Sequence, residues 1–197
     1  IDHLDTAHTI YTGWNLEEAQ PESVSSQKEI NAAMIHGIEQ ITGKVKIFKA
    51  GKFEMVNPLE ELKVSYPNIG TYSAFIFGHP EAITFPYHFK NLLNSINLAH
   101  GNKSTIFVLK TIRKLINLKI LTKKTAAQFL EWLEKKETSR KHTKASSLPE
   151  IYALAIGFKN GSEESVGVSL NGESSRELTM GEATSYPLSL ALKMFLN

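Results

Sequence analysis

The dipeptide Asn160-Gly161 places the strongest constraint on the fold of this chain. It separates two runs rich in apolar and β-branched residues, 151–159 and 165–170. A two-residue connection that needs a positive φ at both positions favours Asn followed by Gly, because this pair fits a type I′ turn. The sequence therefore predicts an antiparallel hairpin here. A second hairpin is expected over residues 44–56, with its turn at Gly51-Lys52.

Capping residues and helical spacing predict three helices before this hairpin. A capping box at Ser26-Gln27-Lys28-Glu29 opens an amphipathic segment over residues 27–41. Ser104 and Thr122 are the expected N-caps of two further helices, over residues 104–117 and 122–135.

The remaining patterns complete the expected fold. A closing helix is expected from Pro187 to Leu196 and a loop over residues 136–148. Further strands are expected over residues 3–11, 62–66, 71–77 and 176–179. Because strands and helices do not alternate regularly, the sequence predicts an α+β fold: a mainly antiparallel mixed sheet with helices packed on one face.

Composition excludes several classes of protein. The 197 residues include no Cys, which rules out a disulfide framework and fits a reducing cytoplasm. No apolar run reaches the 18 residues or more that a membrane-spanning helix needs. Twelve Lys/Arg against three Glu give residues 103–144 a charge of +9, so the rest carries 2 − 9 = −7. This local basic face does not make the whole chain a typical nucleic-acid binder.

The sequence contains none of the common cofactor or nucleophile motifs. It has no Gly-x-Gly-x-x-Gly, no Gly-x-x-x-x-Gly-Lys-Ser/Thr and no Gly-x-Ser-x-Gly. The histidines lack the spacing of a helical zinc motif, and His3, His8 and His100 are interpreted as surface or strand-end residues. We therefore expect no metal or cofactor site within this chain.

The stretch from Tyr66 to Pro86 is the most informative candidate site. It consists of a buried strand flanked by polar and aromatic clusters at 68–72 and 79–84. In one interpretation His79 and Glu81 point into a cleft and transfer a proton, since histidine titrates near neutral pH. In the other, His79-Pro80-Glu81 is a turn with a half-buried histidine and a solvated carboxylate.

Three segments resemble the saccharopine dehydrogenase-like family, which includes saccharopine dehydrogenases, lysine 6-dehydrogenases and carboxynorspermidine dehydrogenases. They are Tyr66-Pro67-Asn68-Ile69-Gly70-Thr71-Tyr72, then His79-Pro80-Glu81-Ala82-Ile83-Thr84-Phe85-Pro86, and finally Ala183-Thr184-Ser185-Tyr186-Pro187-Leu188-Ser189-Leu190-Ala191. The resemblance implies an oxidoreductase that transfers a hydride at a carbon–nitrogen bond of an amino-acid substrate, as in lysine metabolism. It also implies that residues 1–197 are a single substrate-binding and dimerisation domain, whose partner Rossmann domain lies outside this chain and binds NAD or NADP.

The resemblance also suggests which residues form the site. It implies His79 as a proton carrier, and the following substrate contacts: Asn68, Thr71, Tyr72, Glu81, Thr84, Tyr87 and Thr184. Some members have an arginine where this chain has Thr84-Phe85-Pro86-Tyr87, so an arginine clamp for a carboxylate is not expected here. The resemblance does not identify the substrate, the choice of NAD or NADP or the direction of the reaction.

Two further observations leave alternatives open. The chain opens on Ile1 without Met and stops within an apolar pattern, which suggests a fragment that is inactive without its Rossmann domain. The same fold is also consistent with a non-catalytic module that docks a partner through its basic helices or a sheet edge. Nucleic-acid binding through residues 103–144 is a third and weaker hypothesis.

Overall fold

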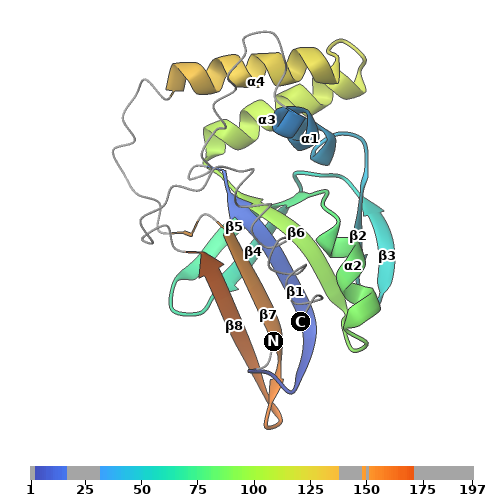
Figure 1. The fold of residues 1–197 in the computed structure, drawn as a ribbon, viewed down its shortest axis with the longest axis vertical. Coiled ribbons are helices and arrows are strands. Elements are labelled where there is room, and N and C mark those ends of the chain that lie inside the picture. The colour runs from blue at the N-terminus through green and yellow to red at the C-terminus, as the bar shows by residue number, and fades with distance from the viewer. Residues whose placement is uncertain (1–2, 17–31, 138–147, 150, 171–197) are drawn as a thin grey trace, which may run out of the picture.

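The computed structural model describes residues 3–16, 32–137, 148–149 and 151–170 of the chain. These residues form four helices and eight strands (Figure 1). The helices are α1 (Ala32–Gln40), α2 (Glu81–His88), α3 (Lys103–Asn117) and α4 (Lys123–Glu137). The strands are β1 (Thr6–Asn15), β2 (Val45–Lys49), β3 (Lys52–Val56), β4 (Glu61–Tyr66), β5 (Gly70–Phe77), β6 (Asn94–His100), β7 (Ile151–Lys159) and β8 (Ser162–Leu170).

All eight strands belong to one sheet that is built around β6. The main path runs β3-β2-β6-β1-β7-β8. β1 lies parallel to β6, whereas all the other pairs are antiparallel. Along the other edge of β6, Ser95 pairs with β2 and residues 97–99 pair with β5. The predicted α+β class with a mainly antiparallel mixed sheet is therefore confirmed.

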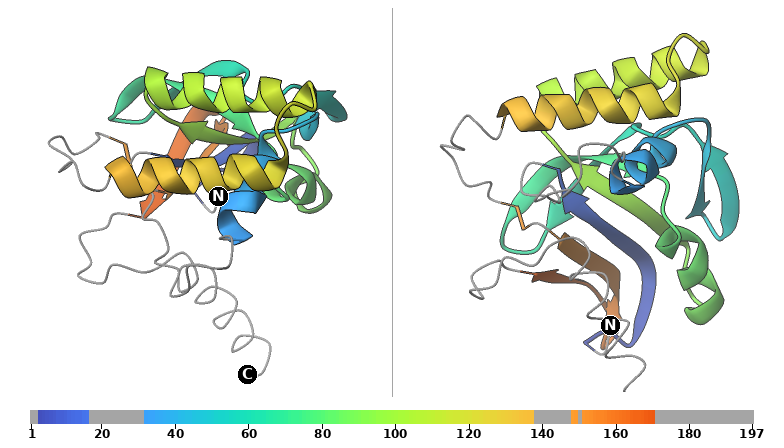
Figure 2. Two further views of the ribbon diagram at one scale, coloured as in Figure 1. Left: turned by 90° about the horizontal axis from the view of Figure 1, so that it is seen from above. Right: turned by 45° about the horizontal axis from the view of Figure 1, so that its top comes forward.

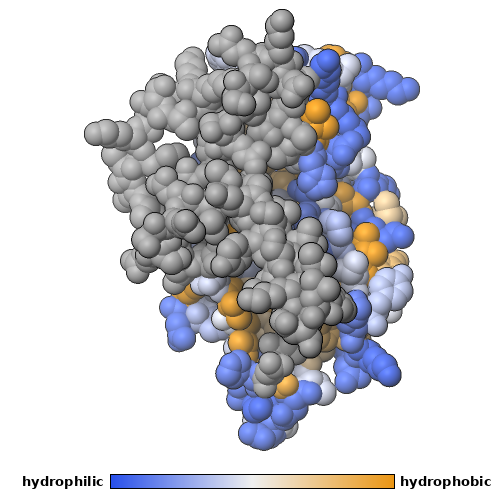
Figure 3. All heavy atoms as spheres, in the orientation of Figure 1, coloured by the Kyte–Doolittle hydropathy of each residue, from blue (hydrophilic) through white to orange (hydrophobic). Residues whose placement is uncertain are grey.

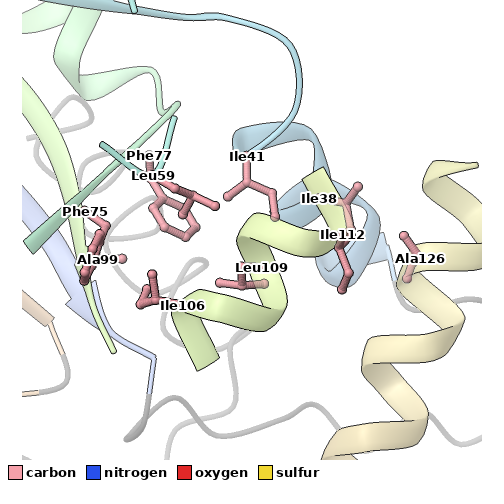
Figure 4. Packing of buried hydrophobic residues seen from close by; sticks show 11 residues of the cluster. Ile38, Ile41, Leu59, Phe75, Phe77, Ala99, Ile106, Leu109, Ile112 and Ala126 are labelled. Atoms are coloured by element: carbon pink, nitrogen blue, oxygen red, sulfur yellow. The ribbon is translucent and has the colours of Figure 1, made fainter. Parts of the chain in front are cut away.

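Helices α1, α3 and α4 gather over one end of the sheet, as the views of Figures 1 and 2 show. Helical spacing directs Ile106, Leu109 and Ile112 of α3 toward the same buried cluster. They meet Phe75 and Phe77, which share one face of β5 because successive strand side chains alternate (Figure 4). This cluster joins the helical layer to the sheet.

The opposite face of the sheet holds a second core. The alternate residues Ala74 and Ile76 of β5 contribute to it, together with Leu98 and Leu154. The sheet curls around this core, so that the Tyr66 and Tyr152 rings lie 5.2 Å apart.

No helix within the described ranges has the length and apolar character needed to cross a bilayer.

Several predicted elements agree with the structure. The hairpin at Asn160-Gly161 forms as expected, and these two residues have φ values of 50° and 80°. The hairpin predicted over 44–56 also forms, but its turn is at Ala50-Gly51 and not at Gly51-Lys52, because Lys52 already pairs with Lys49. The backbone N–H of Thr125 donates to Oγ1 of Thr122 at 3.1 Å, which confirms Thr122 as a cap. The helix predicted over 27–41 is described from Ala32 to Gln40. The tip at the β7–β8 turn is hydrophilic and exposed (Figure 3).

Other predictions were wrong or incomplete. The N-cap of α3 is Asn102 and not Ser104, because Oδ1 of Asn102 accepts the N–H of Thr105 at 2.8 Å. β1 continues to Asn15, beyond the predicted end. Helix α2, which contains Pro86, and strand β6 were not predicted. The strand predicted over 176–179, the closing helix from Pro187 and most of the predicted loop over 136–148 fall outside the described residues.

β6 was not predicted, and its polar residues are buried. Ser95 and Asn97 alternate with apolar neighbours, a pattern that normally indicates one solvated face. In the folded protein both are almost fully covered, and Nδ2 of Asn97 donates to Oγ1 of Thr12 at 2.8 Å. The central strand therefore uses side-chain hydrogen bonds to neighbouring β1 where a hydrophobic residue would be expected.

Candidate functional site

A cavity of about 730 Å³ opens where β1 and β6 end and α3 begins. Its walls include Asn15 at the end of β1, His100 at the end of β6, and Asn102 and Lys103 at the start of α3. Ligands commonly bind beyond the carboxyl ends of parallel strands, which is where this cavity lies. Its volume is within the range of small-molecule sites.

The cavity combines an apolar wall with charges of both signs. Phe75, Ile106 and Leu148 supply much of the apolar surface. Glu61 carries the negative charge, whereas Lys103 and Lys110 carry the positive charges. The Lys110 ammonium lies 5.3 Å from the centre of the Phe75 ring, so one cation is positioned over the apolar wall.

Glu61 is held in place by two neighbours. The Ser73 hydroxyl donates to Oε1 of Glu61 at 2.6 Å, and Nζ of Lys63 lies 3.4 Å from the same oxygen. Lys63 also donates to the Ser73 hydroxyl at 2.6 Å. The hydrogen bond from Ser73, and then that from Lys63, lower the pKa of Glu61. Its carboxylate is therefore ionised and oriented at neutral pH.

His100 lies at the back of the cavity as a neutral ring. Its side chain is buried, and Nδ1 lies 2.7 Å from the Ser73 carbonyl oxygen, which can only accept. Nδ1 therefore carries the proton, and Nε2 accepts from the Tyr66 hydroxyl at 2.7 Å. Burial lowers the pKa of His100, although the hydrogen bond to Ser73 opposes this shift.

Two tyrosines support this ring from inside the sheet. Burial raises the pKa of Tyr66 to about 12, and burial also raises the pKa of Tyr152. The centres of both tyrosine rings lie within 5.5 Å of the His100 ring centre. These side chains remain neutral at physiological pH, so they fix the wall of the cavity without adding charge to it.

The start of α3 adds a polar end to the cavity. Asn102 caps the helix, and Lys103 follows it directly. The N-terminal end of a helix carries a partial positive charge, which favours an anionic group nearby. Together with Lys103, this end of the cavity is suited to a carboxylate.

One sequence-predicted site residue, Tyr72, lines the cavity. Two others lie close to it along the chain but are not among the residues that line the cavity. Asn68 forms the β4–β5 turn with a φ of 61°. The exposed Thr71 hydroxyl lies 2.7 Å from the Ser65 hydroxyl. Thr184 is outside the described residues.

A second group of predicted residues lies beyond the other end of β5. Nδ1 of His79 contacts Oε2 of Glu81, and the His79 ring is 5.6 Å from the Trp14 ring and 6.0 Å from the His36 ring. Burial, and secondly the neighbouring His36, lower the pKa of His79. A neutral imidazole beside a carboxylate can accept a proton near neutral pH.

The remaining members of this group are on α2. Thr84 and Tyr87 are exposed, and the Tyr87 ring lies 5.9 Å from the Phe53 ring.

Among the described residues, no three carboxylates and histidines lie close enough together to hold a metal ion.

The two groups of predicted residues do not share one small-molecule site. β5 contains eight residues, and a strand rises about 3.4 Å per residue, so its two ends are roughly 24 Å apart. Tyr72 lies near one end, whereas His79 follows the other. A single amino-acid-sized ligand cannot contact both.

Several residues of the cavity were not identified from the sequence. Glu61 and Ser73 occupy ordinary strand positions, so nothing local marks them, whereas Lys103 and Lys110 were noted only as part of the basic segment 103–144. The polar run His100-Gly101-Asn102-Lys103 was a second available signal, because it connects a short apolar segment to a helix start.

Comparison with known proteins does not identify the chain: the sequence matches no protein-family model and no curated protein.

Proposed function

We propose that this chain is the substrate-binding and dimerisation domain of an NAD(P)-dependent, saccharopine dehydrogenase-like oxidoreductase. Its reaction is hydride transfer at a carbon–nitrogen bond of an amino-acid substrate. The observation that carries this proposal is the pairing of opposite charges in one cavity, Glu61 against Lys103 and Lys110. The resemblance of residues 66–72 and 79–86 to that family supports it independently.

The cavity complements a zwitterionic amino acid in three ways. The ionised Glu61 carboxylate accepts hydrogen bonds from an ammonium group. Lys103 and the N-terminal end of α3 attract a carboxylate. Phe75 and Ile106 offer apolar surface to an aliphatic side chain. In this proposal the substrate lies in the cavity, and His79, at the far end of β5, does not contact it.

The dinucleotide in this proposal is bound by a separate Rossmann domain. The residues of this chain do not fit NAD or NADP: the sequence contains no Gly-x-Gly-x-x-Gly, and the described sheet has one parallel strand pair, β1 with β6. The nicotinamide, once bound by that domain, supplies the hydride chemistry. Residues of the present chain bind and orient the substrate.

Calorimetry of the 197-residue chain with a panel of amino acids tests the proposal. We expect saturable binding of at least one amino acid, weakened about tenfold or more by Glu61→Gln because a charge-assisted hydrogen bond is lost. Glu54→Gln is the matched control, since Glu54 pairs with Lys52 on β3, away from the cavity. Absence of saturable binding, or equal weakening by both substitutions, would contradict the assignment.

A non-catalytic interaction module is the second candidate function. Phe107 and Phe129 are 72% and 44% exposed on the basic helices α3 and α4, and exposed aromatic groups often mark docking surfaces. If the chain binds no amino acid, this second function is favoured. A homodimer is proposed under either function and does not separate them, whereas nucleic acid and membranes are not proposed as partners.

A further inference from the structure

A second cavity, of about 760 Å³, lies between α3 and the segment that connects β3 to β4. Asn57 and Glu60 belong to that segment, whereas Lys110, Arg113 and Lys114 belong to α3. It adjoins the first cavity, since Glu61 and Lys110 border both. All of its walls belong to the described residues.

Arg113 carries a positive charge that no carboxylate of the described residues neutralises. Its Nη2 donates to Oδ1 of the uncharged Asn57 at 3.0 Å, which fixes the guanidinium without cancelling its charge. Nε is buried and has no acceptor among the described residues. A partly buried cation without a counter-ion is unfavourable, so this geometry suits a site that an anion completes.

Two lysines place further positive charge on the same wall. Lys110 is one helical turn before Arg113, and Lys114 follows it directly. Elsewhere in the described part of the chain, Lys52, Lys63, Lys123 and Lys159 each pair with a carboxylate. Within that same part, neither Arg113 nor Lys114 forms an ion pair.

The acidic residues of the cavity do not neutralise this wall. Ser73 and Lys63 already hold the Glu61 carboxylate. Glu60 is exposed, so water and salt screen its repulsion of an incoming anion. Three cations thus face two carboxylates, one of which already has a cationic partner.

We propose that this second cavity binds a phosphate group. An arginine fork combined with two lysine charges matches the several oxygens and double charge of phosphate better than a single carboxylate. The site adjoins the proposed amino-acid site and shares Glu61 and Lys110 with it, but the proposal requires no catalytic role for this chain.

Titration of the 197-residue chain by NMR or calorimetry tests the site, using inorganic phosphate, adenosine 5′-monophosphate and acetate as probes. We expect saturable phosphate binding that Arg113→Gln weakens about tenfold or more, and that Arg113→Lys also weakens because the fork is lost. Acetate is expected to bind more weakly than phosphate. If the monophosphate binds more tightly than inorganic phosphate, the physiological source is a phosphate ester; equal binding indicates free phosphate.

Two control variants make the result specific. Lys123→Gln removes a lysine that pairs with Glu39 and lies outside the cavity, and Lys103→Gln removes a charge from the first cavity only. Both should bind phosphate as the unmodified chain does. Lys114→Gln changes an exposed side chain, so it should fold normally and still weaken binding several-fold.

Three outcomes would overturn the proposal: no saturable phosphate binding, equal affinity for acetate and phosphate, or unchanged affinity in both Arg113→Gln and Lys114→Gln. The amino-acid measurement with Glu61→Gln is separate from this one, so failure of either proposal leaves the other to be judged by its own experiment.

Discussion

The Tyr66–His100 hydrogen bond holds one of the side chains that line the candidate cavity. It joins residues 34 positions apart. His100 also donates from Nδ1 to the Ser73 carbonyl of β5, and the hydroxyl of the same serine donates to Glu61. A buried polar group that loses its partner retains the free-energy cost of desolvation. The imidazole and the phenol are therefore a structural unit rather than two separate polar residues.

Replacement of Tyr66 by Phe should destabilise the protein. The substitution leaves Nε2 of His100 buried without a donor, and we expect the free energy of unfolding to fall by about 1–3 kcal/mol in urea denaturation. Tyr87→Phe is the control, because Tyr87 is 73% exposed, and should change stability by less than about 0.5 kcal/mol. Equal effects of the two substitutions would show that the hydrogen bond contributes nothing measurable.

At the scale of elements, two glycines differ in whether their backbone conformation accepts a side chain. Gly161 turns β7 into β8 with a φ of 80°, a conformation that residues with a Cβ adopt only with strain. Gly37 lies within α1, where an added Cβ would meet no heavy atom within 4 Å. The same substitution to alanine therefore acts in opposite directions at the two positions.

Gly161→Ala should lower the free energy of unfolding by about 1–2 kcal/mol, because it imposes a left-handed conformation on alanine. Gly37→Ala should raise it by about 0.5–1 kcal/mol, because alanine loses less backbone entropy in a helix than glycine does. Denaturation curves of the two variants provide the measurement. A stabilising Gly161→Ala would contradict the type I′ assignment of the turn.

At the scale of the whole molecule, two half-buried or buried histidines make stability depend on pH. Burial lowers the pKa of both His79 and His100 in the folded protein below the unfolded value near 6.5. As pH falls through that value, the unfolded chain takes up protons that the folded chain does not. The pKa values of Asp5 and Glu61 are also lowered, but these two carboxyl groups change the free energy of unfolding only at more acidic pH.

We expect the free energy of unfolding to decrease as pH falls from about 7 to about 5, by at most about 1.4 kcal/mol per pH unit for each histidine. His100→Gln should reduce this slope, whatever its effect on stability at pH 7. Denaturation at several pH values measures both quantities. A slope that does not change in His100→Gln would mean that His100 is not the responsible group.

Elements with a strong local pattern were predicted well, and those without one were not. The Asn160-Gly161 hairpin and the helix capped by Thr122 follow from nearest-neighbour chemistry. Helix α2 contains Pro86, and β6 buries Ser95 and Asn97, so both contradict the simple rules. At the candidate site, Tyr72 was identified, Lys110 was noted only as part of the basic segment 103–144, and Glu61 was not identified, because only packing brings these residues to one cavity.

The sequence by itself determined the turns, the helix faces and the α+β class, because these depend on backbone conformation and on periodicity over a few residues. The tertiary structure decided which strands flank β6, which charges meet in each cavity and which nitrogen of His100 carries the proton. Those features join distant residues, such as Asn15, whose side-chain amide donates to the Leu148 carbonyl across 133 positions. Long-range contacts of this kind depend on how the whole core packs, which no short segment encodes.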